Sequence, residues 1–299
     1  MKFLSVILPT SLSLGYKIKD KGRPFVKKKH KHLKSLSLVL ILYVLMSCNQ
    51  SNQTHQSNDS TSTSDVMTDK NTFYQYNIWW GFVNKVFDGD LTVKELKTKG
   101  DIGLGSYTKL EGELVMLDGI PYRIREDGSV SVPEDEDKIV YVDAAFFEPE
   151  FSFELNQQIN FDSLRELING KLPTKNQFYA FTIKGDFNYL KCGGLTRQEK
   201  PYTDGLDVLI PARPVFEREN FPGTIVGFYC PEFIGNINVA GYHFHFISDD
   251  KTFGGHVMEL EAESLTVQVD PLLDYHFTLP DTEDFFNVSL DKEFQYEKK

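Results

Sequence analysis

The segment Gly241-Tyr242-His243-Phe244-His245-Phe246 alternates aromatic rings and imidazoles, and it constrains the chain more than any other feature. In an extended strand, successive side chains point to opposite faces. His243 and His245 then share one face, while the aromatic rings occupy the other. The segment therefore predicts a β-strand that presents two imidazoles on one face, where they can ligate a single ion.

A third histidine, His256, follows eleven residues after His245. The intervening residues 249–255 are long enough for a turn that brings a neighbouring strand alongside. Three protein ligands with one open position are typical of catalytic zinc sites, whereas structural zinc sites are closed by four ligands. We therefore expect these three histidines to bind Zn²⁺, although iron, manganese or nickel accept the same ligands. The alternative is that they are ordinary core residues.

The rest of the body is rich in predicted strands. Phe and Tyr are plentiful (24 and 14), which favours sheets. Asp118-Gly119 is a hairpin turn signal, and residues 73–87 fit either a strand or a helix. Apolar or alternating runs bounded by turn residues predict strands at 111–117, 121–125, 139–147, 178–191, 223–229, 237–248 and 256–269.

Two short helices are expected. Thr92 and Glu95 have the spacing of a capping box, in which each side chain accepts a hydrogen bond from the other residue's backbone. Ser163 and Glu166 repeat this spacing, and Gly170 would end the second helix. Helices are therefore predicted to be few and short.

These patterns predict an α+β fold that is β-rich, with mixed β-sheets. A linker at residues 169–174 contains Gly and Pro and separates two parts of the body. We expect two intimately associated halves, an N-terminal half over residues 71–170 and a C-terminal metal-binding half over residues 171–299.

The N-terminus has the form of an export signal. Residues 1–47 carry ten Lys or Arg and one acidic residue, and they include an apolar run of 11 residues, 36–46. This run is too short to span a bilayer as a helix, and its flanks predict a signal peptide. Leu45-Met46-Ser47-Cys48 resembles the bacterial lipobox, so Cys48 is expected to carry a lipid. Residues 49–70 then form a flexible tether, and the protein is expected to be an exported lipoprotein of the bacterial cell envelope.

Charge is unevenly distributed along the chain. Residues 48–299 carry 42 acidic and 22 basic residues, a net charge of −20. Such a body repels nucleic acid, and no nucleic-acid partner is expected. Contact with a membrane is expected only through the lipid anchor.

Two cysteines, Cys192 and Cys230, remain if Cys48 is lipidated. They form an even pair in a compartment where disulfides can form. A bridge between them and two buried free thiols both agree with the sequence.

Several blocks of the body resemble the α-acetolactate decarboxylase family, and they follow the family's order. The resemblance runs from about Phe73 to about Leu290. The matching blocks are GDIGLG (100–105), LEGELV (110–115), QEKPY (198–202), GTIVGF (223–228), INVAGYHFHFIS (237–248) and GGHV (254–257).

The resemblance implies roles for particular residues. His243, His245 and His256 match the family's zinc ligands. Glu113 matches a catalytic glutamate close to the metal, and Glu297 is the best match to a second glutamate near the C-terminus.

One position departs from the family. Gly193 stands where the family has an arginine that faces the substrate. Another cation can take over its role, and the candidates are Lys191, Arg197 and Arg213. The other interpretation is an altered substrate or a loss of activity.

The resemblance implies zinc-dependent decarboxylation of 2-acetolactate, a 2-hydroxy-3-keto acid, to acetoin. The metal would stabilise the enediolate left by loss of CO2, and Glu113 would deliver a proton to it or orient the oxygens at the metal. A homodimer is also implied. The alternatives are a non-catalytic or substrate-shifted metal-binding lipoprotein of the same fold, a zinc hydrolase, and a cupin-like barrel.

Overall fold

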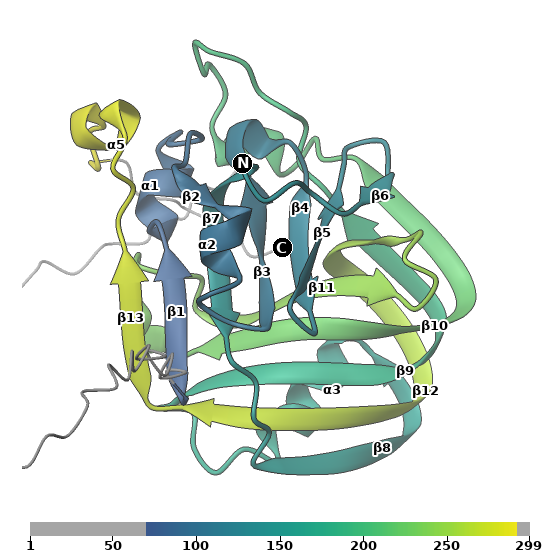
Figure 1. Cartoon of the computed structure of the whole chain (residues 1–299). Helices are drawn as coiled ribbons and strands as arrows, with labels where there is room; N and C mark the ends of the chain where they lie inside the picture. The colour runs from purple at the N-terminus through teal and green to yellow at the C-terminus, as the bar shows by residue number, and fades with distance from the viewer. Residues whose placement is uncertain (1–69, 292–299) are drawn as a thin grey trace, which may run out of the picture. The chain divides into compact units, whose positions relative to one another are not determined.

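The computed structural model describes residues 70–291, and two β-sheets carry most of that part of the chain (Figure 1). Cys48, Glu297 and the expected signal peptide lie outside the described residues, as does the tether up to residue 69. Within the described range, no helix is long and apolar enough to cross a membrane. The strand-rich fold with mixed sheets and few short helices confirms the predicted class.

The first sheet has eight strands. Its order is β13-β1-β7-β3-β4-β5-β6, with β2 paired to β7, and β1 and β13 are parallel while the other pairs are antiparallel. The strands are β1 (Thr72–Tyr76), β2 (Leu91–Thr92), β3 (Ile102–Tyr107), β4 (Glu113–Leu117), β5 (Ile120–Ile124), β6 (Val130–Ser131), β7 (Lys138–Ala145) and β13 (Asp274–Thr278).

The second sheet has five antiparallel strands in the order β11-β10-β9-β12-β8. An additional pairing between β11 and β12 brings the start of β12 beside β11, so the sheet curls back on itself at that end. The strands are β8 (Phe151–Asn160), β9 (Phe178–Gly193), β10 (Val215–Cys230), β11 (Gly241–Ser248) and β12 (Gly254–Leu272).

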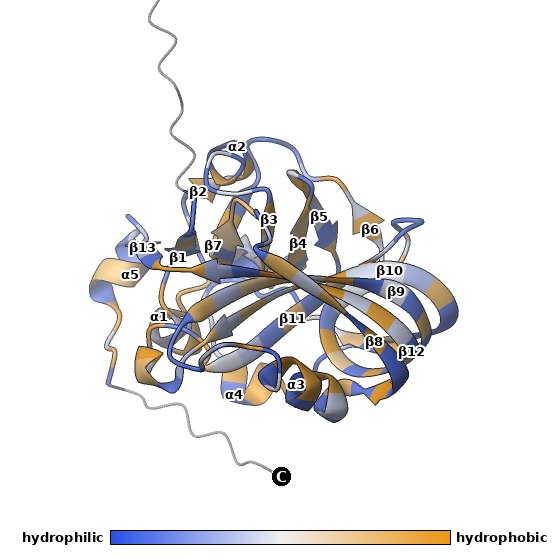
Figure 2. Cartoon of the chain, turned by 90° about the horizontal axis from the view of Figure 1, so that it is seen from below, coloured by the Kyte–Doolittle hydropathy of each residue, from blue (hydrophilic) through white to orange (hydrophobic). Residues whose placement is uncertain are grey.

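Short helices complete the described chain. They are α1 (Trp79–Val83), α2 (Val93–Leu96), α3 (Phe161–Asn169), α4 (Leu206–Leu209) and α5 (Glu283–Asn287), with 3-10 turns at Thr108–Leu110 and Glu232–Ile234. Figure 2 shows the first sheet on one face of the long curved strands and α3 on the other. The middle of the second sheet is therefore covered on both faces, whereas β8 and the first residues of β10 are largely exposed.

Apolar packing accounts for these layers. Val115 and Leu104 of the first sheet belong to one buried cluster with Val226 and Phe228 of the second. A separate cluster packs the second sheet against the apolar face of α3. Burial of such side chains contributes roughly 1.5–3 kcal/mol each, which makes the contact between the sheets a major source of stability.

Turn and cap chemistry confirms two local predictions. Asp118 and Gly119 have φ of 53° and 73° and connect β4 to β5, as a two-residue hairpin turn requires. Thr92 Oγ1 accepts a hydrogen bond from Glu95 N at 3.2 Å, and Glu95 Oε2 accepts one from Thr92 N at 2.9 Å. The capping box of α2 is therefore present.

The second helix begins earlier than the sequence predicted. Its N-cap is Asn160, whose side chain accepts from Ser163 N at 2.9 Å, while Ser163 Oγ accepts from Asn160 N at 2.8 Å. Ser163 is thus the third helical residue and not the cap, and Glu166 has no capping role. Asn caps as well as Ser, and the helix presents Leu164 and Ile168, which are four residues apart, on one buried face.

Strand boundaries also shifted. The strand expected over 237–248 begins only at Gly241. Asn238 precedes it, and its side chain donates a hydrogen bond to Asp143 in a buried polar network. The region 73–87 contains a strand followed by a helix, so the prediction of a strand and the prediction of a helix are each correct for part of it. The two sheets do not divide at residues 169–174: β8 and α3 lie with the second sheet, and β13 returns to the first.

Cys192 and Cys230 are both buried free thiols. Cys192 pairs with Phe216 at one end of β10, whereas Cys230 lies at the other end of that strand. A disulfide needs Cα atoms within about 7 Å of each other. The bridge considered for this pair is therefore absent, and free thiols are the alternative that the structure supports.

A buried carboxyl group lies in the core of the first sheet. Asp143 is fully buried, and its Oδ1 accepts a hydrogen bond from Asn238 Nδ2 at 2.9 Å, while its Oδ2 has no partner within the described chain. Burial raises the pKa of Asp143 to about 8, although the hydrogen bonds from Asn238 and Tyr141 oppose the shift. Burial therefore favours the neutral form of this carboxyl group in the folded protein.

We expect Asp143→Asn to flatten the dependence of stability on pH. The pKa of Asp143 rises from 3.8 in the unfolded chain to about 8 in the fold, so its contribution is complete below the lower value and is lost as the pH rises through the higher one. At roughly 1.4 kcal/mol per pKa unit, the loss by pH 9 amounts to a few kcal/mol. Thermal melts from pH 5 to 9 measure it. The exposed Asp186→Asn is the control, and equal slopes for wild type and Asp143→Asn contradict the prediction.

Candidate metal centre

Three histidines converge where β11 and β12 pair. His245 and His256 are direct neighbours across the two antiparallel strands, and His243 lies two residues before His245 on the same face. The ring centroids are 5.0 Å (His243–His245), 5.1 Å (His243–His256) and 5.3 Å (His245–His256) apart. One nitrogen from each ring lies within 4.8 Å of the others. The structure therefore brings together all three histidines that the sequence singled out.

A backbone contact fixes the tautomer of His245. Its Nδ1 lies 2.8 Å from the carbonyl oxygen of Leu114 on β4. A carbonyl only accepts, so Nδ1–H donates and Nε2 carries the free lone pair. Orientation of a ligating imidazole by a carbonyl is usual in metal sites. Leu114 belongs to the other sheet, so the contact ties the ligand set to both layers.

The side chains suit a divalent cation. His243 Nδ1 is buried and has no hydrogen-bond partner in the described part of the chain, although buried ring nitrogens normally have one. Burial lowers the pKa of all three histidines, that of His245 to about 4. The imidazoles are therefore neutral at neutral pH, which is the form that ligates a metal. These donors fit a divalent transition-metal ion.

Glu113 approaches the cluster from the first sheet. It is the first residue of β4, and its side chain is buried. Its Oε2 lies 3.8 Å from His245 Nε2, which is too far for a hydrogen bond. Burial raises the pKa of Glu113 to about 7, against an opposing effect of Arg213. The carboxyl group can therefore hold or release a proton near neutral pH beside the imidazoles.

Gly193 lies at the edge of the cluster, directly opposite His256 in the pairing of β9 with β12. A Cβ atom at this position would come within 2.7 Å of Arg213 Cδ and 2.9 Å of Met258 Sδ. The space beside Gly193 is thus filled by the side chain of Arg213. The sequence identified Arg213 only as one of three candidate cations. Met258 and the carbonyl group of Leu114 were missed, because no sequence pattern marks either of them as part of the site.

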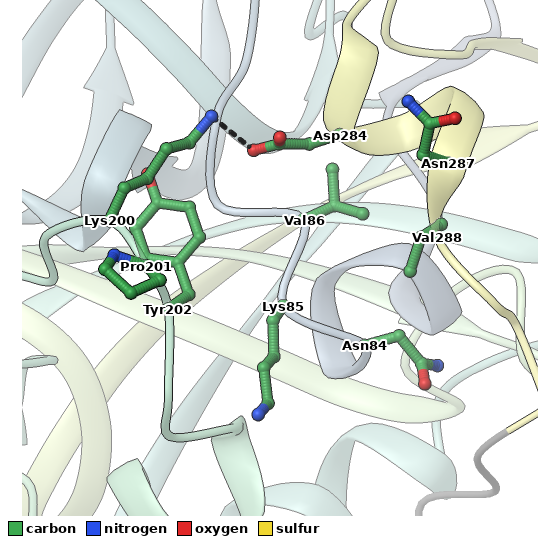
Figure 3. Close-up of a pocket in the computed structure, with 9 residues that line it drawn as sticks. All are labelled: Asn84, Lys85, Val86, Lys200, Pro201, Tyr202, Asp284, Asn287 and Val288. Atoms are coloured by element: carbon green, nitrogen blue, oxygen red, sulfur yellow. Dashed lines mark ion pairs between the residues drawn. The ribbon is translucent and has the colours of Figure 1, made fainter.

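The QEKPY block lies elsewhere. Lys200 forms ion pairs with Asp88 and, at 2.8 Å, with Asp284, while Tyr202 donates to Asp88 at 2.8 Å. Lys200, Tyr202 and Asp284 border a surface hollow between the loop after β9 and helix α5 (Figure 3). None of the three histidines lines it. The block therefore joins the loop after β9 to helix α5, and none of its residues belongs to the group of three histidines.

Comparisons with known proteins identify the family of the chain. A family profile described as alpha-acetolactate decarboxylase matches residues 73–292. The alpha-acetolactate decarboxylase of Bacillus licheniformis is 36% identical over 219 residues, covering 73% of this chain and 86% of the relative. The enzyme of the same name from Methanosarcina mazei is 37% identical over 236 residues, covering 79% and 80% respectively.

Solved structures show the same fold. The alpha-acetolactate decarboxylase of Bacillus subtilis strain 168 superposes with a TM-score of 0.72 at 35% identity, over 74% of this chain and 94% of that one. A Staphylococcus aureus protein described as similar to the family gives 0.71 at 28% identity over 74% and 94%. Both similarities span most of each chain. The chain therefore belongs to the alpha-acetolactate decarboxylase family of carboxy-lyases.

Proposed function

We propose that the protein decarboxylates 2-acetolactate to acetoin and that it requires Zn²⁺ bound by His243, His245 and His256. One observation carries the proposal. Three neutral imidazoles lie together between the sheets, with the carboxyl group of Glu113 3.8 Å from the nearest of them. This arrangement combines a metal-binding group with a proton carrier, and the reaction needs both.

The reaction places two demands on the site. When CO2 leaves, two electrons remain on the former α-carbon, and the adjacent ketone accepts them to give an enediolate. A bound divalent ion supplies the Lewis-acid stabilisation of the negative charge that develops. The neutral side chains of His243, His245 and His256 would hold the ion there, and the hydrogen bond from His245 to Leu114 keeps one ring in place.

The second demand is a proton. The enediolate must be protonated on carbon, and Glu113 is the carboxyl group next to the imidazoles. Burial favours the protonated form of its carboxyl group, because a charged carboxylate is poorly solvated there. We infer that Glu113 delivers this proton. General acid catalysis of this kind typically raises the reaction rate by about 10²–10⁴-fold.

A direct assay tests the proposal. The purified protein is incubated with racemic acetolactate, with and without a chelator, and both acetoin and CO2 are measured. We expect stoichiometric acetoin and CO2 that cease when the metal is removed and return with Zn²⁺. Release of neither product by metal-loaded protein contradicts the proposal and favours a non-catalytic binding protein. Hydrolysis of ester substrates in the same samples would indicate a zinc hydrolase instead.

We also propose that Cys48 anchors the enzyme in the cell envelope and that the body is a homodimer. The first rests on the lipobox sequence and the second on family resemblance. We expect radiolabelled palmitate to be incorporated into the wild-type chain in the native bacterium and not into Cys48→Ser. Unlabelled wild type refutes the anchor, and a monomer mass in analytical ultracentrifugation refutes the dimer.

A further inference from the structure

The substrate proposed above is an anion, whereas its product acetoin is neutral. A carboxylate that enters a half-buried site needs a cation to offset the loss of its hydration. Three cations are candidates near this end of β9: Lys191 lies on the strand, Arg197 follows it in the chain, and Arg213 lies beside Gly193. Their surroundings distinguish them.

Two of these cations already have acidic partners. Lys191 Nζ lies 3.2 Å from a carboxylate oxygen of Glu259 and 3.5 Å from one of Glu217. Arg197 lies 2.8 Å from Glu199 and 3.9 Å from Glu111. Both charges are therefore largely neutralised by the protein itself.

Arg213 differs from both. Its Nε donates to the carbonyl oxygen of Ile210 at 3.1 Å, and no carboxylate of the described residues lies within 4.0 Å of its guanidinium. The half-buried guanidinium thus retains its charge with its terminal amino groups available. Such a planar donor fork matches the geometry of a carboxylate.

The position of Arg213 is defined by Gly193. A Cβ atom on Gly193 would lie 2.7 Å from Arg213 Cδ and 3.3 Å from Arg213 Nη1, so the arginine lies across the bare backbone of β9. Gly193 is itself the pairing partner of His256. The guanidinium therefore lies beside the strand position that adjoins a proposed metal ligand. Its charge also lowers the pKa of Glu113 and of the three histidines, in agreement with this location.

The backbone around Arg213 is constrained. Pro211 and Pro214 flank it with fixed φ, Arg213 N donates to Ile210 O at 3.3 Å, and Gly194 N donates to Pro214 O at 3.0 Å. The turn before β10 is thereby fastened to the end of β9. Little conformational freedom of the backbone remains to be lost when a ligand binds.

We propose that Arg213 binds the carboxylate of the substrate, and that glycine at position 193 is required to leave room for it. This assignment rests on the proposed function for the identity of the anion. It also accounts for product release, because acetoin has no carboxylate to hold. Arg213, in the turn before β10, thus supplies the positive charge. Gly193, at the end of β9, contributes no side chain.

The test compares an anionic and a neutral ligand that cannot react. Calorimetry measures binding of 2,3-dihydroxy-2-methylbutanoate and of butane-2,3-diol to Zn²⁺-loaded wild type, Arg213→Gln, Arg213→Lys and the control Arg197→Gln. We expect Arg213→Gln to weaken binding of the acid about 10- to 100-fold, to leave binding of the diol unchanged, and to leave the zinc content unchanged. Arg213→Lys should recover part of the loss, and Arg197→Gln should behave as wild type.

A second variant probes the role of the glycine. Gly193→Ala should weaken binding of the acid in the wild-type background, because the new methyl group displaces Arg213, and should have little effect when combined with Arg213→Gln. Adding Gly193→Arg to Arg213→Gln should restore binding, since the two side chains compete for one space. Gly193→Arg alone should bring no gain.

The possible results separate the two proposals. If wild type forms acetoin but Arg213→Gln binds the acid as tightly as wild type, the assignment of Arg213 is wrong and the proposed function stands. If wild type forms no acetoin but binds the acid through Arg213, the proposed function fails and the assignment stands. Equal weakening of acid and diol, or no detectable binding of the acid to wild type, overturns the assignment.

Discussion

His243→Ala is expected to lose its bound metal and with it nearly all formation of acetoin. Lewis-acid stabilisation of the developing charge is worth several kcal/mol, so turnover should fall by about 10³-fold or more. His243 is the best of the three histidines for this test, because its buried Nδ1 has no hydrogen-bond partner among the described residues. Removing the ring leaves no protein group newly unpaired at that atom.

Metal content by atomic emission and acetoin formation measure the effect of His243→Ala on the same samples. His276→Ala is the matched control, since His276 is exposed on β13, away from the three rings. The control should retain both metal and activity. A His243→Ala protein that keeps a full equivalent of zinc and normal turnover would show that the three rings do not share a catalytic ion.

Glu113→Gln should lower turnover by about 10²–10⁴-fold while the metal stays bound. The amide has the shape of the carboxyl group but carries no acidic proton for the carbon of the enediolate. Because burial disfavours the charged carboxylate in the folded state, removal of the ionisable group should also leave the thermal stability equal or slightly higher at pH 8. The loss of activity would then not arise from unfolding.

Glu111→Gln serves as the control for Glu113→Gln. Glu111 lies two residues earlier, is half exposed, and faces Arg125 and Arg197 at 3.9 Å. Its replacement should leave turnover within about twofold of wild type, as expected for a weak surface ion pair. Turnover by Glu113→Gln close to that of this control would falsify the role of Glu113 as proton donor.

The alternation of His243 and His245 with aromatic residues specified a strand and the shared face of the two rings, because side chains on an extended backbone alternate with a period of two. The sequence also specified the tight turn at Asp118-Gly119 and the capping box of Thr92 and Glu95, since both depend on residues close together in the chain. The second helix shows the limit of such reasoning. Ser163 and Glu166 have the spacing of a capping box, yet Asn160 and Ser163 form it in the structure.

The remaining features of the site depend on packing between sheets. Glu113 and Leu114 lie near His245 only because β4 packs over β11. Arg213 lies near the histidines only because the start of β10 pairs with the end of β9. Periodicity and turn chemistry are local properties, so the sequence alone revealed the imidazoles and the strand that carries them. The cation beside the imidazoles that has no acidic partner among the described residues can be identified only from its distances to acidic residues far away in the chain. Only the tertiary structure contains those distances.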